Sequence, residues 1–392
     1  MKKYLSLILT FCIFISLYTP CFAGYEGNYE AENDFLTTSA DFDFDVEGAY
    51  LCEASTGKVL YAEDEYKTQS PASVTKIMTL LLVCEALAAG KYSLGDTVTV
   101  SSNAASMGGS QVFLEEGERV TVEDLIKSTV IASGNDSAMA LAELTSGSES
   151  AFVKLMNKRA LELGLKNTTF ENPTGLDDTT TNHYSCAADI AAMSRELIKH
   201  DVILKYSSIW QDTIRDGEFT LTNTNRLVRY YEGCTGLKTG STDKAGYCIS
   251  ATAKRGNMHL VAVIMGAESR DKRNEAARQL LDYGFANYAL LEFGGEFVEE
   301  CDVLSGVYDT VPLYSTKYST VIEKSKQNEV EKIYEIPETL TAPINKGDVV
   351  GKILYKCDGM QIGYSEVLAD SYVEKINISD LFVRILERII KG

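Results

Sequence analysis

Three short motifs in the sequence combine a nucleophile with groups that could activate it and hold a substrate. They are Ser73–Lys76, Ser133–Asn135 and Lys238–Gly240, which read SxxK, SxN and KTG. A serine hydroxyl is a weak nucleophile until a nearby base takes its proton, and a lysine can be that base when burial and a second cation keep its amine neutral. The motifs therefore predict covalent acyl transfer, with Ser73 as the nucleophile and Lys76 as the base.

Context separates these motifs from chance copies, because each of them is weak alone. The SxxK pattern occurs four times, and the other copies begin at Ser55, Ser241 and Ser269. Ser73 and Lys76 come just before residues 77–89, which are apolar almost all round and predict a buried helix. Side chains three residues apart on a helix face one side, and the N-terminal amides of the helix favour negative charge there. A serine that merely begins a helix is the alternative, which the downstream SxN and KTG disfavour.

Composition excludes several other classes of function. The chain has 392 residues with 56 acids and 37 bases, a net charge of −19, so we expect no nucleic acid partner. Its three histidines share no short segment, so we expect no metal site and no cofactor; they are His183, His200 and His259. The chain lacks a GxSxG motif, which favours a Ser-Lys arrangement over a Ser-His-Asp triad.

The elements expected along the chain would bring the motifs together. Strands, then helices, then strands again predict an α+β fold in which helices cover an antiparallel sheet. Ser70 and Pro71 are typical of a helix start with Ser70 as the N-cap, and KTG is expected just before a strand. The expected strands are 49–53, 59–62, 245–253 and 260–265, and the expected helices are 77–89, 122–131, 137–145, 151–163, 187–198 and 272–288.

Composition also divides the chain into segments. Residues 1–23 resemble a secretory signal, because two lysines precede an apolar stretch that is too short to span a membrane; an uncleaved anchor is the alternative. The expected segments that follow are an acidic, flexible lead-in at 24–47, a catalytic domain at 48–292, a small β domain at 293–376 and an amphipathic helix at 377–392.

The last segment predicts a helix that associates with a membrane surface. One side carries Leu381, Phe382, Ile385, Leu386, Ile389 and Ile390, and the other carries Asp380, Arg384, Glu387, Arg388 and Lys391. A helix with one apolar face and one basic, polar face lies in the plane of a membrane interface. A helix that packs on the β domain is the alternative.

The motifs and their order resemble those of a known family, the low-molecular-mass penicillin-binding proteins, which are serine-type D-alanyl-D-alanine carboxypeptidases. The resemblance covers nearly all of the mature chain. The segments that carry it are Pro71–Lys76, Ser133–Asp136, Asn172–Asp177, Asn182–Ser185, Gly236–Ser241 and Ala342–Gly347. It implies a β-lactamase/transpeptidase-like catalytic domain followed by the small all-β domain.

The resemblance implies a role for each catalytic residue. Ser73 forms the acyl-enzyme, and Lys76 accepts its proton as general base. Ser133 relays a proton toward the leaving amine, and Asn135 binds the peptide amide. The backbone N–H groups of Ser73 and Ser241 form the oxyanion hole.

The resemblance also implies a substrate-binding set, which is Lys238, Thr239, Gly240, Ser241 and Arg273. Lys238 and Thr239 hold the terminal carboxylate of the substrate, and the charge of Lys238 lowers the pKa of Lys76. Arg273 either helps to bind that carboxylate or is a surface arginine on a helix.

The implied reaction removes the terminal D-alanine from peptidoglycan stem peptides that end in D-Ala-D-Ala, and β-lactams inhibit it by acylating the same serine. Two other functions stay open: a β-lactamase of the same fold, and a non-hydrolysing protein that binds muropeptides or penicillins. Glu171 lies near the place where a class A β-lactamase keeps its deacylating glutamate, but its segment matches the carboxypeptidase loop, so we interpret it as a surface residue. We interpret His183 as a structural hydrogen-bonding residue near the site.

The predicted partners are therefore the stem peptide, β-lactams as inhibitors and a membrane surface through the C-terminal helix. The predicted location is peripheral, on the outer face of the bacterial cytoplasmic membrane, after export.

Overall fold

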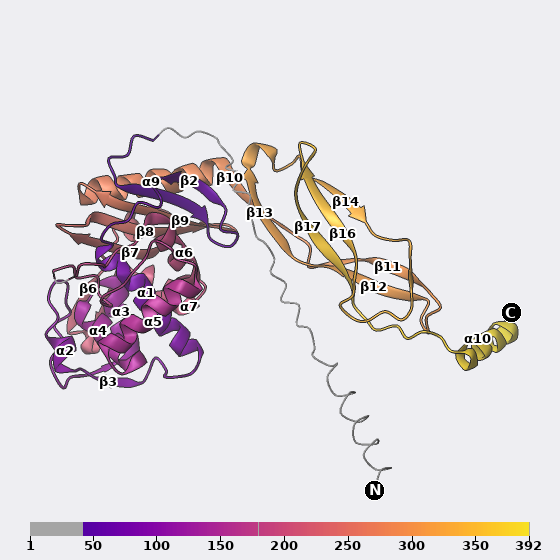
Figure 1. Ribbon diagram of the computed structural model, residues 1–392, viewed down its shortest axis with the longest axis horizontal. Coiled ribbons are helices and arrows are strands. Elements are labelled where there is room, and N and C mark those ends of the chain that lie inside the picture. Colours follow the sequence, from indigo (N-terminus) through magenta and orange to yellow (C-terminus); the bar gives the residue numbers. More distant parts are fainter. Residues whose placement is uncertain (1–41, 179, 392) are drawn as a thin grey trace, which may run out of the picture. The chain divides into compact units, whose positions relative to one another are not determined.

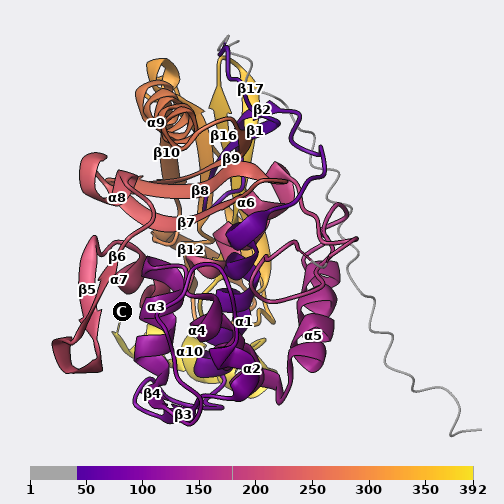
Figure 2. The same ribbon diagram turned by 90° about the vertical axis from the view of Figure 1, so that its left-hand side faces the viewer.

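The computed structural model describes residues 42–178 and 180–391, and Figures 1 and 2 show it in two views. The side chains of residues 387, 388 and 391 are outside this description. The signal sequence expected at 1–23 and most of the acidic lead-in also lie outside the described residues.

An antiparallel sheet of five strands organises the first domain. Its strand order is β2-β1-β9-β8-β7, so strands from the two ends of the domain pair in the middle of the sheet. The strands are β1 Gly48–Glu53, β2 Val59–Glu63, β7 Cys234–Thr242, β8 Gly246–Arg255 and β9 Met258–Ala267. β7 is an edge strand, and an edge leaves backbone groups free to pair with an extended ligand.

Strand β9 shows how the sheet is buried on both faces. Successive side chains of a strand point to opposite faces, so a strand covered on both sides is apolar throughout. Residues 260, 262 and 264 belong to one apolar cluster, and residues 261, 263 and 265 belong to another. The sheet therefore separates two hydrophobic cores.

A layer of helices covers one face of the sheet, with α1 Lys76–Ala88 at its centre (Figure 2). Most of α1 is buried, which explains why its sequence is apolar on every side. The helices around it are α2 Ser102–Ala105, α3 Val122–Ile131, α4 Asn135–Ser146, α5 Glu149–Glu162, α6 Ala187–Leu197 and α7 Asp201–Ser207.

Helix α9, Arg270–Asn287, covers the opposite face of the sheet (Figure 1). Its buried residues, such as Leu280 and Phe285, join the core formed by residues 260, 262 and 264. Short elements complete the domain: η1 Ala72–Thr75, β3 Thr97–Thr99, β4 Arg119–Thr121, β5 Gln211–Ile214, η2 Arg215–Gly217, β6 Phe219–Thr222 and α8 Leu227–Tyr230.

The described end of the acidic lead-in, residues 42–47, contacts the catalytic domain. The rings of Phe42 and Phe44 stack with centroids 4.7 Å apart, and Phe42 also meets Tyr61 edge-on at 5.2 Å. The N–H of Glu47 donates to Met265 O at 2.8 Å. This part of the segment thus differs from the flexible arm that was expected. The expectation rested on the acidic composition of the whole segment and overlooked two aromatic side chains that pack against the domain.

A second, all-β domain follows α9. Strand β10, Tyr288–Phe293, pairs with β13, Tyr318–Glu323, and a six-stranded sheet has the order β14-β16-β17-β12-β11-β15. Its other elements are β11 Phe297–Leu304, β12 Thr310–Ser315, η3 Lys324–Lys326, β14 Glu331–Glu335, β15 Thr339–Thr341, β16 Val349–Cys357 and β17 Met360–Ala369. In its core the ring of Tyr355 stacks on those of Phe293 and Tyr318, with centroids 4.1 and 5.7 Å away.

The chain ends in helix α10, Ile378–Lys391. Arg384 of its polar side forms an ion pair with Asp309 of the β domain at 3.0 Å and donates to Val307 O at 2.6 Å. Leu381, Phe382, Ile385, Leu386, Ile389 and Ile390 of its apolar side are all exposed. In the part of the chain that the structure describes, no helix is both long enough and apolar enough to cross a membrane.

The α+β fold class expected from the sequence is confirmed, and each of the six expected helices begins and ends within two residues of an observed one. One local prediction was wrong and one strand was missed. Ser70 does not cap a helix, because its hydroxyl instead donates to Asp177 Oδ2 at 3.0 Å and the chain enters α1 through η1. KTG does precede the expected strand 245–253, which is β8, but the sequence did not show that KTG itself lies in a strand, β7. The small and polar residues of β7 show no apolar alternation.

Candidate active site

The nucleophile motif lies where η1 runs into α1. Ser73 is in η1, and Lys76 is the first residue of α1, so the two side chains share one side of the helix start. Lys76 is completely buried. Its Nζ lies 2.9 Å from Ser73 Oγ, 2.5 Å from Asn135 Oδ1 and 2.7 Å from Thr174 O. The structure therefore brings SxxK and SxN together around one amine.

The three partners of Lys76 can accommodate a neutral amine. A neutral amine has two hydrogens and one lone pair, whereas an ammonium group has three hydrogens and cannot accept a hydrogen bond. Asn135 Oδ1 and Thr174 O can only accept, so they take the two N–H groups of Lys76. Ser73 Oγ can accept the third hydrogen of an ammonium group, or its O–H can donate to the lone pair of a neutral amine. In the neutral form the lone pair is placed to take the proton of Ser73.

Electrostatics favour the same protonation state. Burial holds the pKa of Lys76 well below its usual value, and the neighbouring Lys238 charge lowers that pKa further, while Asp136 opposes the shift. Burial also lowers the pKa of Lys238 to about 7, with Arg273 as the second cause. The pKa effect of Lys238 on Lys76 expected from the sequence is thus present, although burial is the larger cause.

Ser133 and Asn135 sit at the turn into α4. Ser133 adopts a positive φ of 64°, and its Oγ accepts a hydrogen bond of 2.8 Å from Lys238 Nζ. Asn135 is the first residue of α4, and its Nδ2 donates to Gly108 O at 2.7 Å. The bond from Nδ2 to Gly108 O fixes the orientation of the Asn135 amide group, so that its Oδ1 points to Lys76.

The carboxylate of Asp136 supports this turn from behind. It is buried, and its Oδ2 accepts from the backbone N–H groups of Val112 and Leu114 at 3.0 and 3.1 Å. These bonds hold the loop that carries Ser110 beside Ser133 in the pocket. The sequence showed Asp136 only as part of a family segment, and nothing in a single sequence signalled its contact with residues that lie more than 20 positions away.

Strand β7 brings the KTG motif against the helix start. Lys238 and Thr239 are buried, and Thr239 Oγ1 donates to Thr224 Oγ1 at 2.8 Å. A Cβ atom on Gly240 would lie 2.8 Å from Ser73 N, closer than real Cβ contacts allow. Glycine is therefore required at this position for the strand to approach the nucleophile, and Ser241 follows it at the exposed edge of the pocket.

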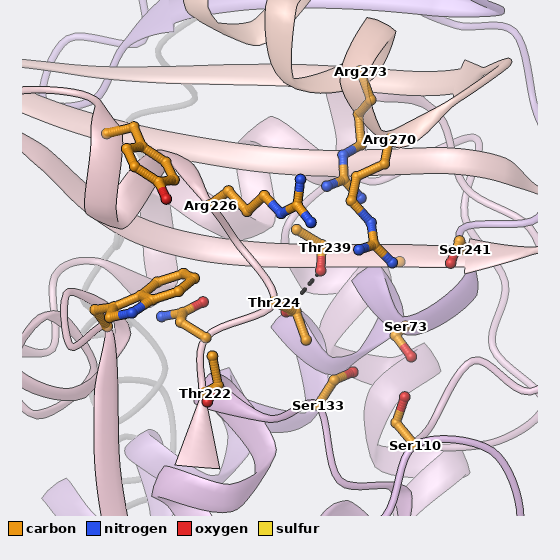
Figure 3. A pocket seen from close by; sticks show the side chains of 14 residues that line it. Ser73, Ser110, Ser133, Thr222, Thr224, Arg226, Thr239, Ser241, Arg270 and Arg273 are labelled. Carbon is orange, nitrogen blue, oxygen red and sulfur yellow. Dashed lines mark hydrogen bonds between the residues drawn. The ribbon is translucent and has the colours of Figure 1, made fainter.

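Arg273 is buried, with 3% of its surface exposed, and its guanidinium points into the pocket (Figure 3). Its Nη2 donates to Asn274 Oδ1 at 2.8 Å. Burial lowers the pKa of Arg273 to about 10, and the nearby Arg270 contributes. The alternative of a surface arginine is therefore wrong, because the side chain turns back over the sheet into the site.

The pocket above these residues has a volume of about 630 Å³. Ser73, Ser133, Thr239, Gly240, Ser241 and Arg273 line it, so six of the nine predicted site residues face one cavity, while Lys76, Asn135 and Lys238 lie buried directly behind. Figure 3 also shows pocket residues that the sequence reasoning missed, namely Ser110, Thr222, Thr224, Arg226 and Arg270. Their residue types are common on any surface, so no pattern marked them.

The segment 172–177 lies against α1 and completes the surroundings of Lys76. Thr174 supplies the carbonyl that accepts from Lys76, and Asp177 Oδ2 accepts from Ser70 Oγ at 3.0 Å and from Thr242 Oγ1 at 2.5 Å. That carboxylate therefore ties β7 to the residues before η1. Gly175, between these two residues, has φ 83°, and a Cβ there would lie 1.8 Å from Ala72 O.

His183 has the structural role expected for it. Its Nδ1 accepts from Glu171 N at 3.1 Å, so Nε2 carries the hydrogen and donates to Thr75 Oγ1 at 2.8 Å. Burial lowers the pKa of His183 to about 4, which keeps the ring neutral. The Glu171 carboxylate accepts from Thr181 N and Asn182 N at 2.8 and 3.1 Å and does not line the pocket.

Comparisons with known proteins identify the family. The family model "D-alanyl-D-alanine carboxypeptidase" matches residues 35–269, and the model "Penicillin-binding protein 5, C-terminal domain" matches residues 286–375. The chain belongs to the D-alanyl-D-alanine carboxypeptidase family. The family predicted from the motifs is therefore confirmed, including its two-domain fold.

Individual members of this carboxypeptidase family are similar to this chain over most of its length. The D-alanyl-D-alanine carboxypeptidase DacF of Bacillus subtilis (strain 168) is 40% identical over 395 residues, covering 99% of this chain and 98% of that protein. DacA of Escherichia coli (strain K12) is 35% identical and covers 81% of each chain. The crystal structure of penicillin binding protein 5 from Haemophilus influenzae has a TM-score of 0.74 at 34% identity, covering 86% of this chain and 99% of that one.

Gly175 offers a test of the local packing in this carboxypeptidase fold. We expect Gly175→Ala to lower the free energy of unfolding by about 3 kcal/mol or more, because both its φ and the contact with Ala72 O become unfavourable. Gly217→Ala is the matched control: Gly217 has φ 93°, but nothing lies within 4 Å of its Cβ position, so only about 1–2 kcal/mol is expected. Urea unfolding of both variants measures the difference, and equal losses would contradict the packing argument.

Lys76→Met tests the neutral amine. Methionine keeps the apolar stem but cannot take the proton of Ser73, so we expect acylation by a penicillin to slow about 10²–10⁴-fold. Lys244→Met, which removes the exposed lysine of another SxxK copy, should leave the rate within twofold of the wild type. Stopped-flow acylation measures both, and an unchanged rate in Lys76→Met would exclude this amine as the base.

The same assay across pH separates the two lysines. Acylation requires neutral Lys76, so its rate falls as the pH drops through the lowered pKa of Lys76. Lys238→Met removes the repelling charge and raises that pKa, so the fall should move to higher pH even if the variant binds penicillin less well.

Proposed function

We propose that this protein is a serine-type D-Ala-D-Ala carboxypeptidase, which removes the terminal D-alanine from peptidoglycan stem peptides through an acyl-enzyme on Ser73. The observation that carries the proposal is the arrangement around Lys76. Two carbonyl acceptors and the Ser73 hydroxyl surround a buried amine whose pKa is strongly lowered. Family membership supports the substrate class, since the relatives named above are D-alanyl-D-alanine carboxypeptidases.

In the first step Ser73 attacks the carbonyl carbon of the penultimate D-alanine while Lys76 takes the hydroxyl proton. The backbone N–H groups of Ser73 and Ser241 stabilise the negative oxygen that forms. Support for this comes from the close approach of β7 to the helix start, where Gly240 would clash with Ser73 N if it carried a side chain. Asn135 helps to hold the peptide amide.

The second step expels D-alanine, and its amine needs a proton. Ser133 Oγ lies 2.8 Å from Lys238 Nζ, which forms a short path for that proton. A group with a pKa of about 7 can both give and take a proton near neutral pH, and burial gives Lys238 such a pKa. Water then hydrolyses the ester on Ser73 and releases the shortened peptide.

The terminal carboxylate binds at Thr239, Lys238 and Arg273. Thr239 and Arg273 line the pocket, and Lys238 lies behind them with its charge close to the same space. β-Lactams carry a carboxylate beside a strained amide, so they bind the same groups and acylate Ser73. These inhibitors and the stem peptide are the small-molecule partners that we propose.

A β-lactamase and a non-hydrolysing binding protein are the alternatives. The bonds of Glu171 to Thr181 N and Asn182 N leave it without a place in the pocket, which weighs against a class A deacylating glutamate. The complete Ser-Lys arrangement weighs against a protein that only binds. Diacetyl-L-Lys-D-Ala-D-Ala discriminates the three functions, because only a carboxypeptidase releases one D-alanine. Fast penicillin turnover without that release would identify a β-lactamase.

Fluorescent penicillin labelling tests the nucleophile. We expect mass spectrometry to find the adduct on the peptide that contains Ser73, and Ser73→Ala to lose both the label and D-alanine release. Ser55→Ala removes the serine of another SxxK copy, which bonds Glu53 Oε2 at 2.8 Å, and should label like the wild type. An adduct on another serine, or undiminished labelling of Ser73→Ala, would refute the assignment.

We also propose that the protein is exported through the signal at 1–23 and rests on the outer face of the cytoplasmic membrane through α10. The exposed apolar side of α10 supports this, because Ile378, Phe382, Ile389 and Ile390 expose 62–87% of their surface. Arg384 of the polar side holds the helix to the β domain while the apolar side stays uncovered by the described residues. An apolar strip of this kind contributes membrane affinity in proportion to its area.

Vesicle binding tests α10. With residues 24–392, we expect the Ile385→Ser, Ile389→Ser double variant to reduce co-sedimentation with anionic phospholipid vesicles at least about tenfold, because two buried apolar groups are lost. Tyr334→Ser, which removes an equally exposed apolar ring from β14, is the control and should bind like the wild type. Equal binding by all three proteins would show that α10 is not the contact.

A further inference from the structure

We propose that Asp177 is a positioning residue for the reaction, because its carboxylate sets the gap between the two N–H groups of the oxyanion hole, those of Ser73 and Ser241. The inference deepens the proposed function and rests on it, since this gap matters only if Ser73 is acylated. Asp177 is not among the described residues that line the pocket. It therefore acts through the two segments of chain that it joins.

The carboxylate of Asp177 joins two segments that lie directly beside these N–H groups. Its Oδ2 accepts a hydrogen bond of 3.0 Å from Ser70 Oγ, which is three residues before Ser73. The same Oδ2 accepts a bond of 2.5 Å from Thr242 Oγ1, which is one residue after Ser241. One oxygen atom therefore links the chain that leads into the nucleophile to the chain that follows the second donor of the hole.

The alternation of side chains along β7 shows why this link bears on the hole. Residues 238, 240 and 242 point to the same face of the strand, because successive side chains point to opposite faces. The amine of Lys238 bonds the turn into α4, and the hydroxyl of Thr242 bonds Asp177. The strand is thus held to the helical layer on both sides of Gly240, where a Cβ atom would lie only 2.8 Å from Ser73 N. These two links set how closely β7 approaches the nucleophile.

Strand β7 needs such a link because it is the edge strand of its sheet. Strand β8 pairs with it on one side, and no strand in the described part of the chain pairs with it on the other. The hydrogen bonds of a β-ladder lie in the plane of the sheet. They fix the position of β7 within the sheet, and they leave its distance from the helices on the face of the sheet to side-chain contacts.

The loop that carries Asp177 is itself fixed to the helix of the nucleophile. Thr79 of α1 donates from its Oγ1 to Pro173 O at 2.6 Å. Within the loop, Asn172 Oδ1 accepts from Gly175 N at 2.7 Å, which holds the turn before Asp177. The carboxylate therefore projects from a rigid base, and only a rigid base can hold catalytic groups to within about 0.5 Å of their productive geometry.

The gap matters more in the transition state than in the bound substrate. The substrate oxygen gains its negative charge only as Ser73 attacks, and N–H donors stabilise it best from about 2.7–3.1 Å. A displacement of about 1 Å can slow a reaction about a hundredfold. The terminal carboxylate binds elsewhere, at Thr239 and Arg273, so loss of the link should slow acylation and leave substrate binding nearly unchanged.

Variants of Asp177 test the link. We expect Asp177→Ala to slow both acylation by a penicillin and the release of D-alanine about 10–100-fold. Asp177→Asn should stay within about threefold of the wild type, because the carbonyl oxygen of asparagine can accept from both hydroxyls. Asp178→Ala removes the exposed carboxylate of the next residue and should leave both rates unchanged. Ser70→Ala should slow acylation by itself but add little to Asp177→Ala, because both changes remove the same contact.

Two affinities separate positioning from a general loss of structure. The boronic acid diacetyl-L-Lys-D-boroalanine forms a tetrahedral adduct on Ser73 Oγ that resembles the transition state, with one oxygen in the oxyanion hole. Asp177→Ala should weaken its binding by about the same factor as it slows acylation. The Kd of diacetyl-L-Lys-D-Ala-D-Ala, measured in the unreactive Ser73→Ala background, should change less than about threefold. Equal changes in the two affinities would refute the positioning role.

The outcomes also separate this inference from the proposed function. If the wild type releases D-alanine and Asp177→Ala is acylated at the wild-type rate, the positioning role fails and the carboxypeptidase stands. If the wild type neither releases D-alanine nor acylates Ser73, the proposed function fails, and the inference that rests on it fails too. If Asp177→Ala does not fold, Ser70→Ala allows the same measurements, since it removes one of the two hydrogen bonds and keeps the carboxylate.

Discussion

The structure depends on one constraint, which is that a lysine amine is buried completely, in surroundings that disfavour its charged form. A charged amine in this place would lose its hydration, and Lys238 would repel it. The neutral form satisfies every partner, because Asn135 Oδ1 and Thr174 O accept its two hydrogens and Ser73 donates to its lone pair. The same surroundings therefore serve stability and reactivity, because the hydrogen bonds that satisfy the buried amine also orient it as a base toward Ser73.

The rest of the domain serves to bring four separate segments to that amine. η1 and the start of α1 supply Ser73 and Lys76, and the turn into α4 supplies Asn135. The loop 172–177 supplies a carbonyl, and β7 supplies the second cation. Two carboxylates link these segments without touching the amine. Asp136 fixes the loop behind Ser133, and Asp177 joins Ser70 to Thr242, so the helical layer and the sheet edge keep a fixed spacing. Backbone contacts that only glycine allows, at Gly175 and Gly240, let these segments approach so closely.

Sequence reasoning recovered what periodicity and motif spacing encode. The long helices follow from their apolar pattern, and Ser73, Lys76, Ser133, Asn135 and the KTG residues follow from their order along the chain. It missed what depends on contacts between distant residues. Ser70 looked like a cap because its bond to Asp177 spans 107 positions, and β7 was not recognised because its residues are selected for the site and not for alternation. Arg226 and Arg270 were missed for the same reason, because the sequence does not show that the fold directs their side chains into the pocket.

The local charge of the pocket explains how a strongly acidic chain can recognise an anionic substrate. At physiological ionic strength the Debye length is about 8 Å, so acids spread over the surface are largely screened from a ligand in the pocket. The groups that remain unscreened are those lining it, and among the described residues these are arginines without any carboxylate. The net charge of −19 thus argues against a polyanion that would touch the whole surface, and it does not argue against a small carboxylate that touches only the pocket. The same separation of local from global charge lets Lys238 lower the pKa of Lys76 against the opposing effect of the buried Asp136 alone, because the surface acids are excluded from the buried, poorly screened space that the two lysines share.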